Sequence, residues 1–307
     1  MTPLRRALAD YLAMRRALGY RPERAEKLLA QFLAYLEDRG ETRLRTETAL
    51  AWARLPTGTD PSWWASRLTL VRGFATYLHT IDPATQVPPT DLLRAPPRRA
   101  TPYLYTDEDV AALLAAASGL RTNHRVATYR TLIGLLVVTG MRVGEAIALD
   151  LHDFDAEQGL ITVRQGKLGK SRALPLHPTA ATAVQQYLHR ADRPAPRHTA
   201  ALFVSTAGTR LLKRNVQHTF LTLVRRVSLR PHTAACRPRL HDMRHRFAVS
   251  TLLDAYRQGH DPEARLALLA TYLGHGDPKS TYWYLSAAPE LMQLAADRLE
   301  RHPGGSA

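Results

Sequence analysis

Apolar residues recur at helical spacing along most of this 307-residue chain. Between residues 25 and 36 they fall three or four positions apart, which places their side chains on one helix face. Gly40 can end that helix, and Asp60 can cap the start of another. Weaker helical patterns cover residues 4–18 and 47–55. The first part of the chain is therefore predicted to be a small all-helical bundle.

The pattern lapses between residues 81 and 102, where prolines and charged residues replace the apolar periodicity. This composition is typical of an inter-domain linker. We place the boundary at residue 99, which predicts one domain at residues 1–99 and a second at residues 100–307.

The second domain begins with Thr106 as a helix cap, followed by a long apolar segment at residues 126–139 that ends at Gly140. Residues 160–164 alternate apolar and polar side chains, and residues 172–176 can return as the partner strand of a β-hairpin. Further helices are predicted at residues 178–190, 213–227, 237–253, 262–273 and 289–301. The predicted fold class is mainly α, with two domains and a small antiparallel β-hairpin in the second.

Positive charge exceeds negative charge, with 42 Lys plus Arg, 27 Asp plus Glu and a formal net charge of +15. This excess favours a polyanionic partner, and nucleic acid is the first expectation. Arg15 and Arg16 are candidate DNA contacts in the helical bundle, with a solvated arginine-rich face as the alternative.

A single cysteine, Cys236, excludes an intramolecular disulfide and favours a reducing compartment. The sequence shows neither a signal-peptide pattern nor an apolar run long enough to span a bilayer. We therefore expect a cytoplasmic protein with no membrane partner.

Two of the five lysines, Lys167 and Lys170, lie in the turn of the predicted hairpin. Lysine can give up a proton when its surroundings lower its pKa, whereas arginine stays protonated. The turn is therefore a candidate site for a general acid. The alternative is a basic hairpin tip that contacts the DNA backbone.

His241, Arg244 and His245 share one face of the helix predicted at residues 237–253 and can converge on a single anion. The two histidines also have the spacing of a metal-binding pair. The arginine between them argues against a bound cation, so we expect no metal and no other cofactor.

Four motifs occur in a fixed order: TGMRVGEAIAL from residue 139, GKLGKSRALPL from 166, LHDMRHRFA from 240 and LGHGDPKSTYWYL from 273. Together they closely resemble the motifs of the tyrosine recombinases, also called phage-type integrases. The resemblance covers the whole second domain and implies that it is catalytic. It also implies that the first domain is a helical core-binding (SAM-like) domain.

The resemblance assigns catalytic roles to six residues, namely Arg142, Lys167, His241, Arg244, His275 and Tyr284. Glu145 matches the acidic residue that supports the site. Tyr284 stands at the position of the nucleophile, and Tyr282 is a second phenol close to it in the sequence. The predicted DNA contacts are Lys170, Arg15, Arg16 and Arg172.

The implied activity is that of a site-specific recombinase or integrase, which cleaves and rejoins DNA through a 3'-phosphotyrosyl intermediate. Such an enzyme serves either a mobile element, which is a phage or a transposon, or the resolution of chromosome dimers. The implied partners are double-stranded DNA and a homotetramer on paired sites, with a dimer on each site. Accessory recombinase or DNA-bending proteins are compatible with this resemblance. Two alternatives stay open: strand nicking and resealing like that of a type IB topoisomerase, and a non-catalytic DNA-binding regulator.

Overall fold

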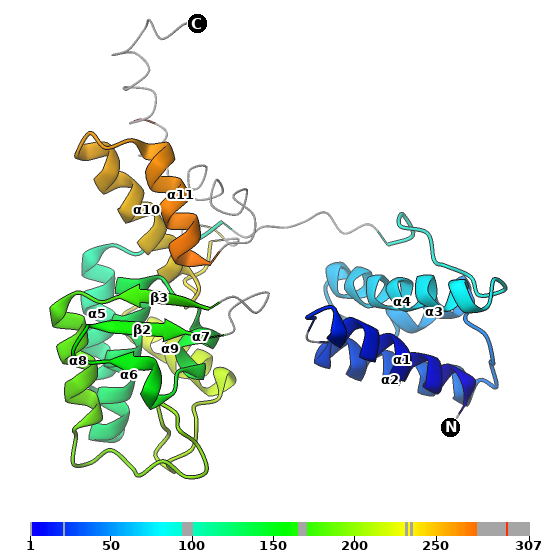
Figure 1. Cartoon of the computed structure of the whole chain (residues 1–307), viewed down its shortest axis with the longest axis horizontal. Helices are drawn as coiled ribbons and strands as arrows, with labels where there is room; N and C mark the ends of the chain where they lie inside the picture. Colours follow the sequence, from blue (N-terminus) through cyan, green and yellow to red (C-terminus); the bar gives the residue numbers. More distant parts are fainter. Residues whose placement is uncertain are drawn as a thin grey trace, which may run out of the picture. The chain divides into compact units, whose positions relative to one another are not determined.

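The computed structural model describes residues 2–20, 22–93, 101–164, 171–230, 233, 236–274 and 293. Its internal contacts divide the chain into two compact units, residues 1–99 and 100–307. Each unit has a hydrophobic core of its own. Helices dominate both units, as the apolar periodicity predicts (Figure 1).

The described part of the first unit is a bundle of helices: α1 (Pro3–Ala17), α2 (Glu23–Asp38), α3 (Thr46–Arg54) and α4 (Pro61–Ile81). Asp60 caps α4 by accepting a hydrogen bond from a backbone N–H of its first turn. Gly40 follows α2 with a φ of 68°, in the left-handed region that favours glycine. Phe32, Trp52 and Phe74 from three of the helices meet in the core. The predicted all-helical bundle is confirmed.

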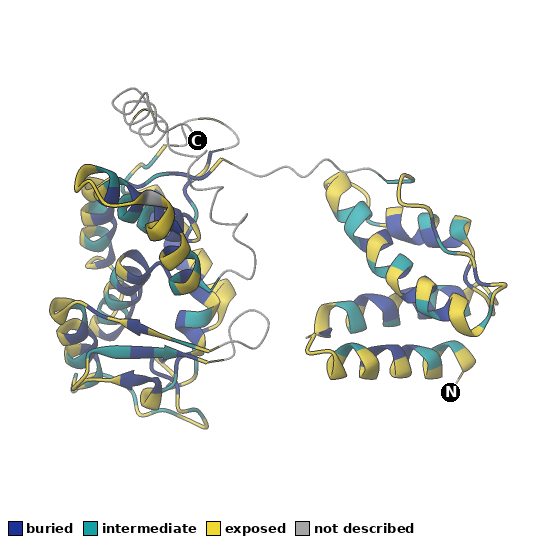
Figure 2. Ribbon diagram, turned by 45° about the horizontal axis from the view of Figure 1, so that its top comes forward, coloured by how far each residue is buried: buried dark blue, intermediate teal, exposed yellow. Residues whose placement is uncertain are grey.

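The second unit contains the helices α5 (Asp107–Ala117), α6 (Asn123–Thr139), α7 (Val143–Ala148), α8 (Pro178–Leu188), α9 (Lys213–Arg226), α10 (Asp242–Arg257) and α11 (Pro262–Leu273). Gly140 ends α6 with a φ of 58°, as its place after the apolar run predicts. The helix predicted at residues 289–301 lies outside the described residues, apart from Gln293. In both units the buried residues line the inner sides of the helices (Figure 2).

Within the described ranges, no helix is both long enough and apolar enough to cross a lipid bilayer.

A small antiparallel sheet accompanies these helices, with strand order β1 (Phe154–Asp155), β2 (Leu160–Val163) and β3 (Arg172–Pro175). Leu160 pairs with Pro175 at the open end of the predicted hairpin and Val163 with Arg172 at its turn end, so the hairpin is confirmed. Ile161 and Leu174 face each other and are fully buried, so one side of the sheet joins the core. Strand β1 is not predicted from the sequence, because two residues are too few to show an alternating pattern.

Replacing Thr106 by alanine should lower the free energy of unfolding of the second unit by about 1 kcal/mol. The Thr106 hydroxyl accepts the N–H of Asp109 at 3.1 Å, and the Asp109 carboxylate accepts the N–H of Thr106 at 3.1 Å. The alanine variant removes half of this capping box at the start of α5. Urea unfolding followed by circular dichroism measures the loss. Thr106→Ser keeps the hydroxyl and should lose much less, so equal losses in the two variants would contradict the capping role.

Candidate active site

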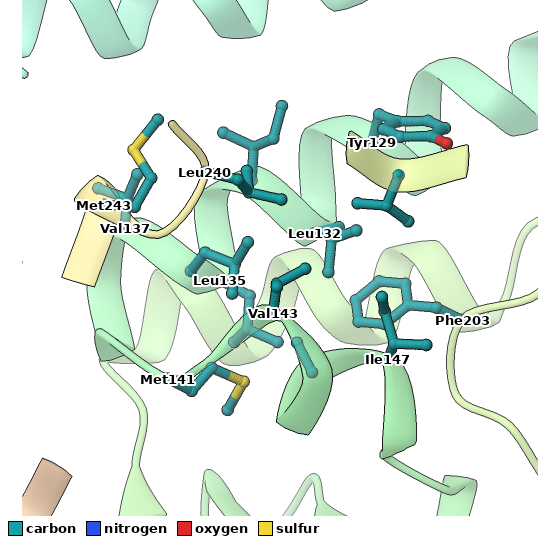
Figure 3. Close-up of a cluster of buried hydrophobic side chains, with 14 of the residues drawn as sticks. Tyr129, Leu132, Leu135, Val137, Met141, Val143, Ile147, Phe203, Leu240 and Met243 are labelled. Atoms are coloured by element: carbon teal, nitrogen blue, oxygen red, sulfur yellow. The ribbon is translucent and has the colours of Figure 1, made fainter. Parts of the chain in front are cut away.

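One hydrophobic core holds both chain segments that carry the predicted catalytic arginines. Met141 and Val143 flank Arg142, and both are buried. Met243, directly before Arg244, is buried in the same cluster (Figure 3). Because core side chains are closely packed, the two arginines are attached to segments that cannot shift independently.

Arg142 is the N-cap residue of α7, and Glu145 lies in the first turn of that helix. The Glu145 carboxylate accepts the backbone N–H of Arg142 at 2.9 Å and its Nη1 donor at 2.7 Å. The Arg142 side chain is 26% exposed. The structure thus brings together the two residues that the sequence places three apart, with the carboxylate holding a guanidinium that also reaches solvent.

Arg172 binds the same carboxylate from β3. Its Nη2 donates to Oε2 of Glu145 at 2.8 Å and its Nη1 to Oε1 at 3.3 Å, while Nε donates to the carbonyl oxygen of Tyr272 at 2.8 Å. Only 12% of the Arg172 side chain is exposed. Arg172 is one of the DNA contacts predicted from the sequence, but its guanidinium lies against α7 and α11.

Glu145 is held in its charged form by these arginines. Burial alone would raise the pKa of its carboxyl group, but hydrogen bonds from Arg172 and Arg142 outweigh burial and lower the pKa to about 2 from an ordinary 4.5. Because this pKa is lower in the folded state, ionised Glu145 stabilises the fold. Its contribution is complete above about pH 4.5 and is lost as the pH falls towards 2. The carboxylate is therefore ionised whenever the site is used near neutral pH.

Arg244 is almost completely buried, with 2% of its surface exposed. Its Nη1 donates to the carbonyl oxygen of Gly140 at 2.9 Å, and its Nη2 donates to that of Leu273 at 2.7 Å. Asp242, also fully buried, pairs with Arg239 at 2.8 Å. The helix face that the sequence marks as polar thus lies largely inside the protein, where hydrogen bonds compensate the burial.

His241 directly precedes α10 as its N-cap residue instead of lying within the helix. Its ring meets the ring of His245 edge to face, with the centroids 5.3 Å apart. Although His241 is exposed, desolvation of its ring by the surrounding protein lowers the pKa of the imidazole, and the charge of Arg244 lowers it further. The ring is therefore neutral near pH 7, which is the form that can accept a proton.

The last turn of α11 receives two guanidinium groups. Arg172 binds the carbonyl of Tyr272, and Arg244 binds the carbonyl of Leu273. The final carbonyls of a helix lack partners within the helix and carry a partial negative charge. These two contacts therefore satisfy the end of α11 and fix its place beside α7 and α10.

Four of the predicted site residues, Lys167, Lys170, His275 and Tyr284, lie outside the described residues, as does Tyr282. The described residues next to these two segments in the sequence nevertheless lie side by side. Arg172 follows the turn that carries the lysines, and Gly274 precedes His275. A Cβ atom on Gly274 would lie 3.0 Å from Nη1 of Arg172, so these two points are in contact.

In the first unit, the two predicted DNA contacts have partners within the protein. The Arg15 guanidinium lies 3.9 Å from the ring centroid of Tyr20. Arg16 donates to Glu26 at 2.6 Å, with both side chains about half exposed. Exposed ion pairs of this kind are weak, and contact of these arginines with DNA stays a prediction.

Among the described residues, one group of three side chains has the spacing of metal ligands, namely Asp150, His152 and Asp153. Arg210 pairs with Asp150, and Arg164 pairs with Asp153. Each carboxylate is thus already matched by a guanidinium. His241 and His245 form no such group with other described side chains.

The comparisons with known proteins agree with this geometry. The family model described as Phage integrase family matches residues 104–290. A Sinorhizobium fredii protein with the provisional name integrase/recombinase y4rB is 44% identical over 98% of both chains. Tyrosine recombinase XerD of Pseudomonas aeruginosa is 30% identical over 90% of this chain and 89% of its own.

The fold itself matches that of the Tn1549 transposon integrase, solved in complex with transposon right end DNA. The TM-score is 0.65 at 18% identity, with 99% of this chain and 100% of the other covered. At that identity the likeness concerns the fold alone. Together with the family match and the 44% identical relative, the chain therefore belongs to the phage integrase family, that of the tyrosine recombinases.

Proposed function

We propose that this chain is a site-specific recombinase that cleaves and rejoins double-stranded DNA through a 3'-phosphotyrosyl intermediate formed by Tyr284. The main support is that Arg244 packs against the segment that carries Arg142, and that, in addition to desolvation, the charges of both arginines lower the pKa of His241. Arg244 donates to the carbonyl of Gly140, two residues before Arg142, although the two arginines are about a hundred residues apart. Two guanidinium groups on adjoining segments, both close enough to His241 to affect its charge, suit a single phosphate group.

The arginines would stabilise the charge that develops when the phosphodiester is attacked. A bond forms between the phenolic oxygen of Tyr284 and phosphorus, the bond to the 5' oxygen breaks, and negative charge grows on the non-bridging oxygens. Arginine forks placed in advance can offset that charge. A phenol has an ordinary pKa of about 10, so its proton needs an acceptor, for which the neutral ring of His241 is suited. Lys167 would return a proton to the 5' oxygen.

The two compact units would divide the work. In this proposal residues 1–99 form the core-binding domain, which holds the duplex through basic side chains such as Arg15 and Arg16, and residues 100–307 form the catalytic domain. A λ integrase dimer bound to a COC' core site has the same fold, with a TM-score of 0.60. We therefore propose a dimer on each DNA site and a tetramer during strand exchange, with accessory proteins where the site requires them.

Nicked suicide duplexes taken from the genomic flanks of this gene test the proposal. The nick lets the short fragment diffuse away, so an attacking tyrosine stays attached to the 3' phosphate. A denaturing gel should then show a protein–DNA adduct with a free 5'-hydroxyl on the released fragment. Binding without an adduct would favour a regulator. An adduct that reseals but never joins a second duplex would favour activity like that of a type IB topoisomerase.

Lys167→Ala should slow single-turnover cleavage by on the order of 10² to 10⁴ while DNA affinity stays nearly unchanged, because a general acid acts on the leaving group. Lys170→Ala should instead weaken DNA binding. The slope of the logarithm of the binding constant against the logarithm of the salt concentration should become shallower by about one, as loss of a phosphate contact predicts. Filter binding at several salt concentrations and quenched cleavage of saturated complex measure the two effects.

A substrate with a 5'-bridging phosphorothiolate is the control for Lys167. A thiolate departs without needing a proton, so this substrate should restore cleavage by Lys167→Ala and leave Arg244→Ala inactive. If the rescue fails for Lys167→Ala, Lys167 is not the acid.

A further inference from the structure

Arg172 connects three elements of the second unit through one largely covered guanidinium. It lies at the first position of β3, binds Glu145 of α7 with both terminal nitrogens, and binds the Tyr272 carbonyl of α11 with Nε. These acceptors lie 27 and 100 residues away along the chain. The side chain is 12% exposed, so its donors are directed at protein groups.

The first consequence of this contact concerns Arg142. The carboxylate of Glu145 accepts hydrogen bonds from both arginines, at 2.7 Å from Arg142 and 2.8 Å from Arg172. Without Arg172, Arg142 alone would hold the carboxylate, through its backbone N–H and its guanidinium, and the two side chains could turn together. The orientation of the Arg142 guanidinium therefore depends on Arg172 through Glu145.

The second consequence concerns the end of α11. Gly274 closes that helix with a φ of 68°, and a Cβ at this position would lie 3.0 to 3.4 Å from three atoms of the Arg172 guanidinium. The guanidinium thus packs directly against the glycine. Gly274 is also the residue from which the chain continues towards His275 and Tyr284.

We propose that Arg172 is a positioning residue for DNA cleavage. It fixes the position of the phosphate-binding guanidinium of Arg142 relative to the last turn of α11. Because the reaction is the one proposed above, the role concerns the cleavage step and not DNA recognition. Arginine suits this role since its planar fork reaches acceptors on two sides at once, which the single ammonium of lysine cannot do. Arg172 would act through Glu145 and Gly274 without contacting the DNA.

The test compares Arg172→Ala and Arg172→Lys with the wild-type chain. Arg164→Ala is the matched control, because Arg164 lies just beyond β2 of the same hairpin and pairs with Asp153. We expect both Arg172 variants to slow single-turnover cleavage of saturated complex by on the order of 10²-fold, the effect of a displacement near 1 Å. Affinity and its salt dependence should stay as in the wild type, and Arg164→Ala should cleave at nearly the wild-type rate.

A titration that needs no DNA tests the same contact. The charged groups facing Glu145 are Arg142 from the start of α7 and Arg172 from β3, and the Tyr272 phenol of α11 lies near Arg172 with its pKa raised to about 12 by burial. Burial raises the pKa of Glu145, and the hydrogen bonds from Arg172 lower it. Without Arg172, this pKa should therefore rise by about 1 to 3 pH units. Carboxyl ¹³C NMR of the labelled full-length chain measures this, with Glu145→Gln to assign the signal.

The outcomes separate the alternatives. Weaker binding with a smaller salt slope and normal cleavage of saturated complex would make Arg172 a DNA contact and overturn the proposal. An unchanged pKa of Glu145 in Arg172→Ala would overturn it as well. If the wild-type chain forms no covalent adduct, the proposed recombinase activity fails, while the Glu145 titration still decides whether Arg172 holds the site. Arg172→Lys keeps the positive charge and provides a folded variant if Arg172→Ala unfolds.

Discussion

Tyr284→Phe is expected to abolish covalent attachment to DNA while DNA binding survives. The substitution removes the phenolic oxygen, which is the only atom of the side chain that can form the bond to phosphorus. Ring size and shape are retained, so the surrounding contacts should change little. Denaturing gels of suicide-substrate reactions measure attachment, and gel shifts of the same samples measure binding.

Tyr282→Phe is the matched control, since it removes the same atom from a phenol two residues away. This variant should remain active. The reverse result, with Tyr282→Phe inactive and Tyr284→Phe still forming an adduct, would move the nucleophile to Tyr282. Loss of attachment in both variants would point to a structural need for the two phenols.

Arg244→Ala is expected to lose cleavage by at least about 10²- to 10³-fold, the effect of removing one donor that stabilises developing charge. It should also lower the free energy of unfolding by about 2 to 5 kcal/mol. The stability loss follows because the carbonyls of Gly140 and Leu273 would lose a charged donor at 2.9 and 2.7 Å inside the protein. Urea unfolding and single-turnover cleavage at saturating protein measure the two losses.

Arg244→Lys separates the two losses. Lysine keeps the charge but cannot reach both carbonyls with a planar fork, so it should recover part of the stability and little of the cleavage. Cleavage close to the wild-type rate in Arg244→Lys would mean that charge alone is needed. Unchanged stability in Arg244→Ala would show that the two carbonyl contacts contribute little to the fold.

The regular elements of the fold could be predicted because their signals are local. Asp60, Thr106 and Gly140 act within one turn of the helices that they bound, and the sequence shows them directly. The pairing of residues 160–163 with 172–175 follows from their alternating patterns and the short segment between them. The spacing of Arg142 and Glu145 likewise predicts their contact, since it spans only three residues.

The burial of the polar side chains could not be predicted in this way. Arg244, Asp242 and Arg172 look like surface residues in any hydropathy pattern, and only their partners make burial favourable. Those partners are often backbone carbonyls such as those of Gly140 and Tyr272, which carry no sequence signal. The one available hint is Gly274, because a glycine after a helix can mark a close approach as well as a left-handed cap.

The two carbonyl contacts of Arg244 also set the order in which the second unit can be completed. They span 104 and 29 residues, and contacts between distant residues form only after long loops have closed. During synthesis the chain emerges from its N-terminus. The first unit and helices α5 to α9 are therefore made before Leu273, whose carbonyl accepts the hydrogen bond from Nη2 of Arg244. Both carbonyl contacts of Arg244 are thus complete only when residue 273 has been made. With the function proposed above, a nascent chain would present its earlier basic helices to DNA before it has a complete site with which to cut it.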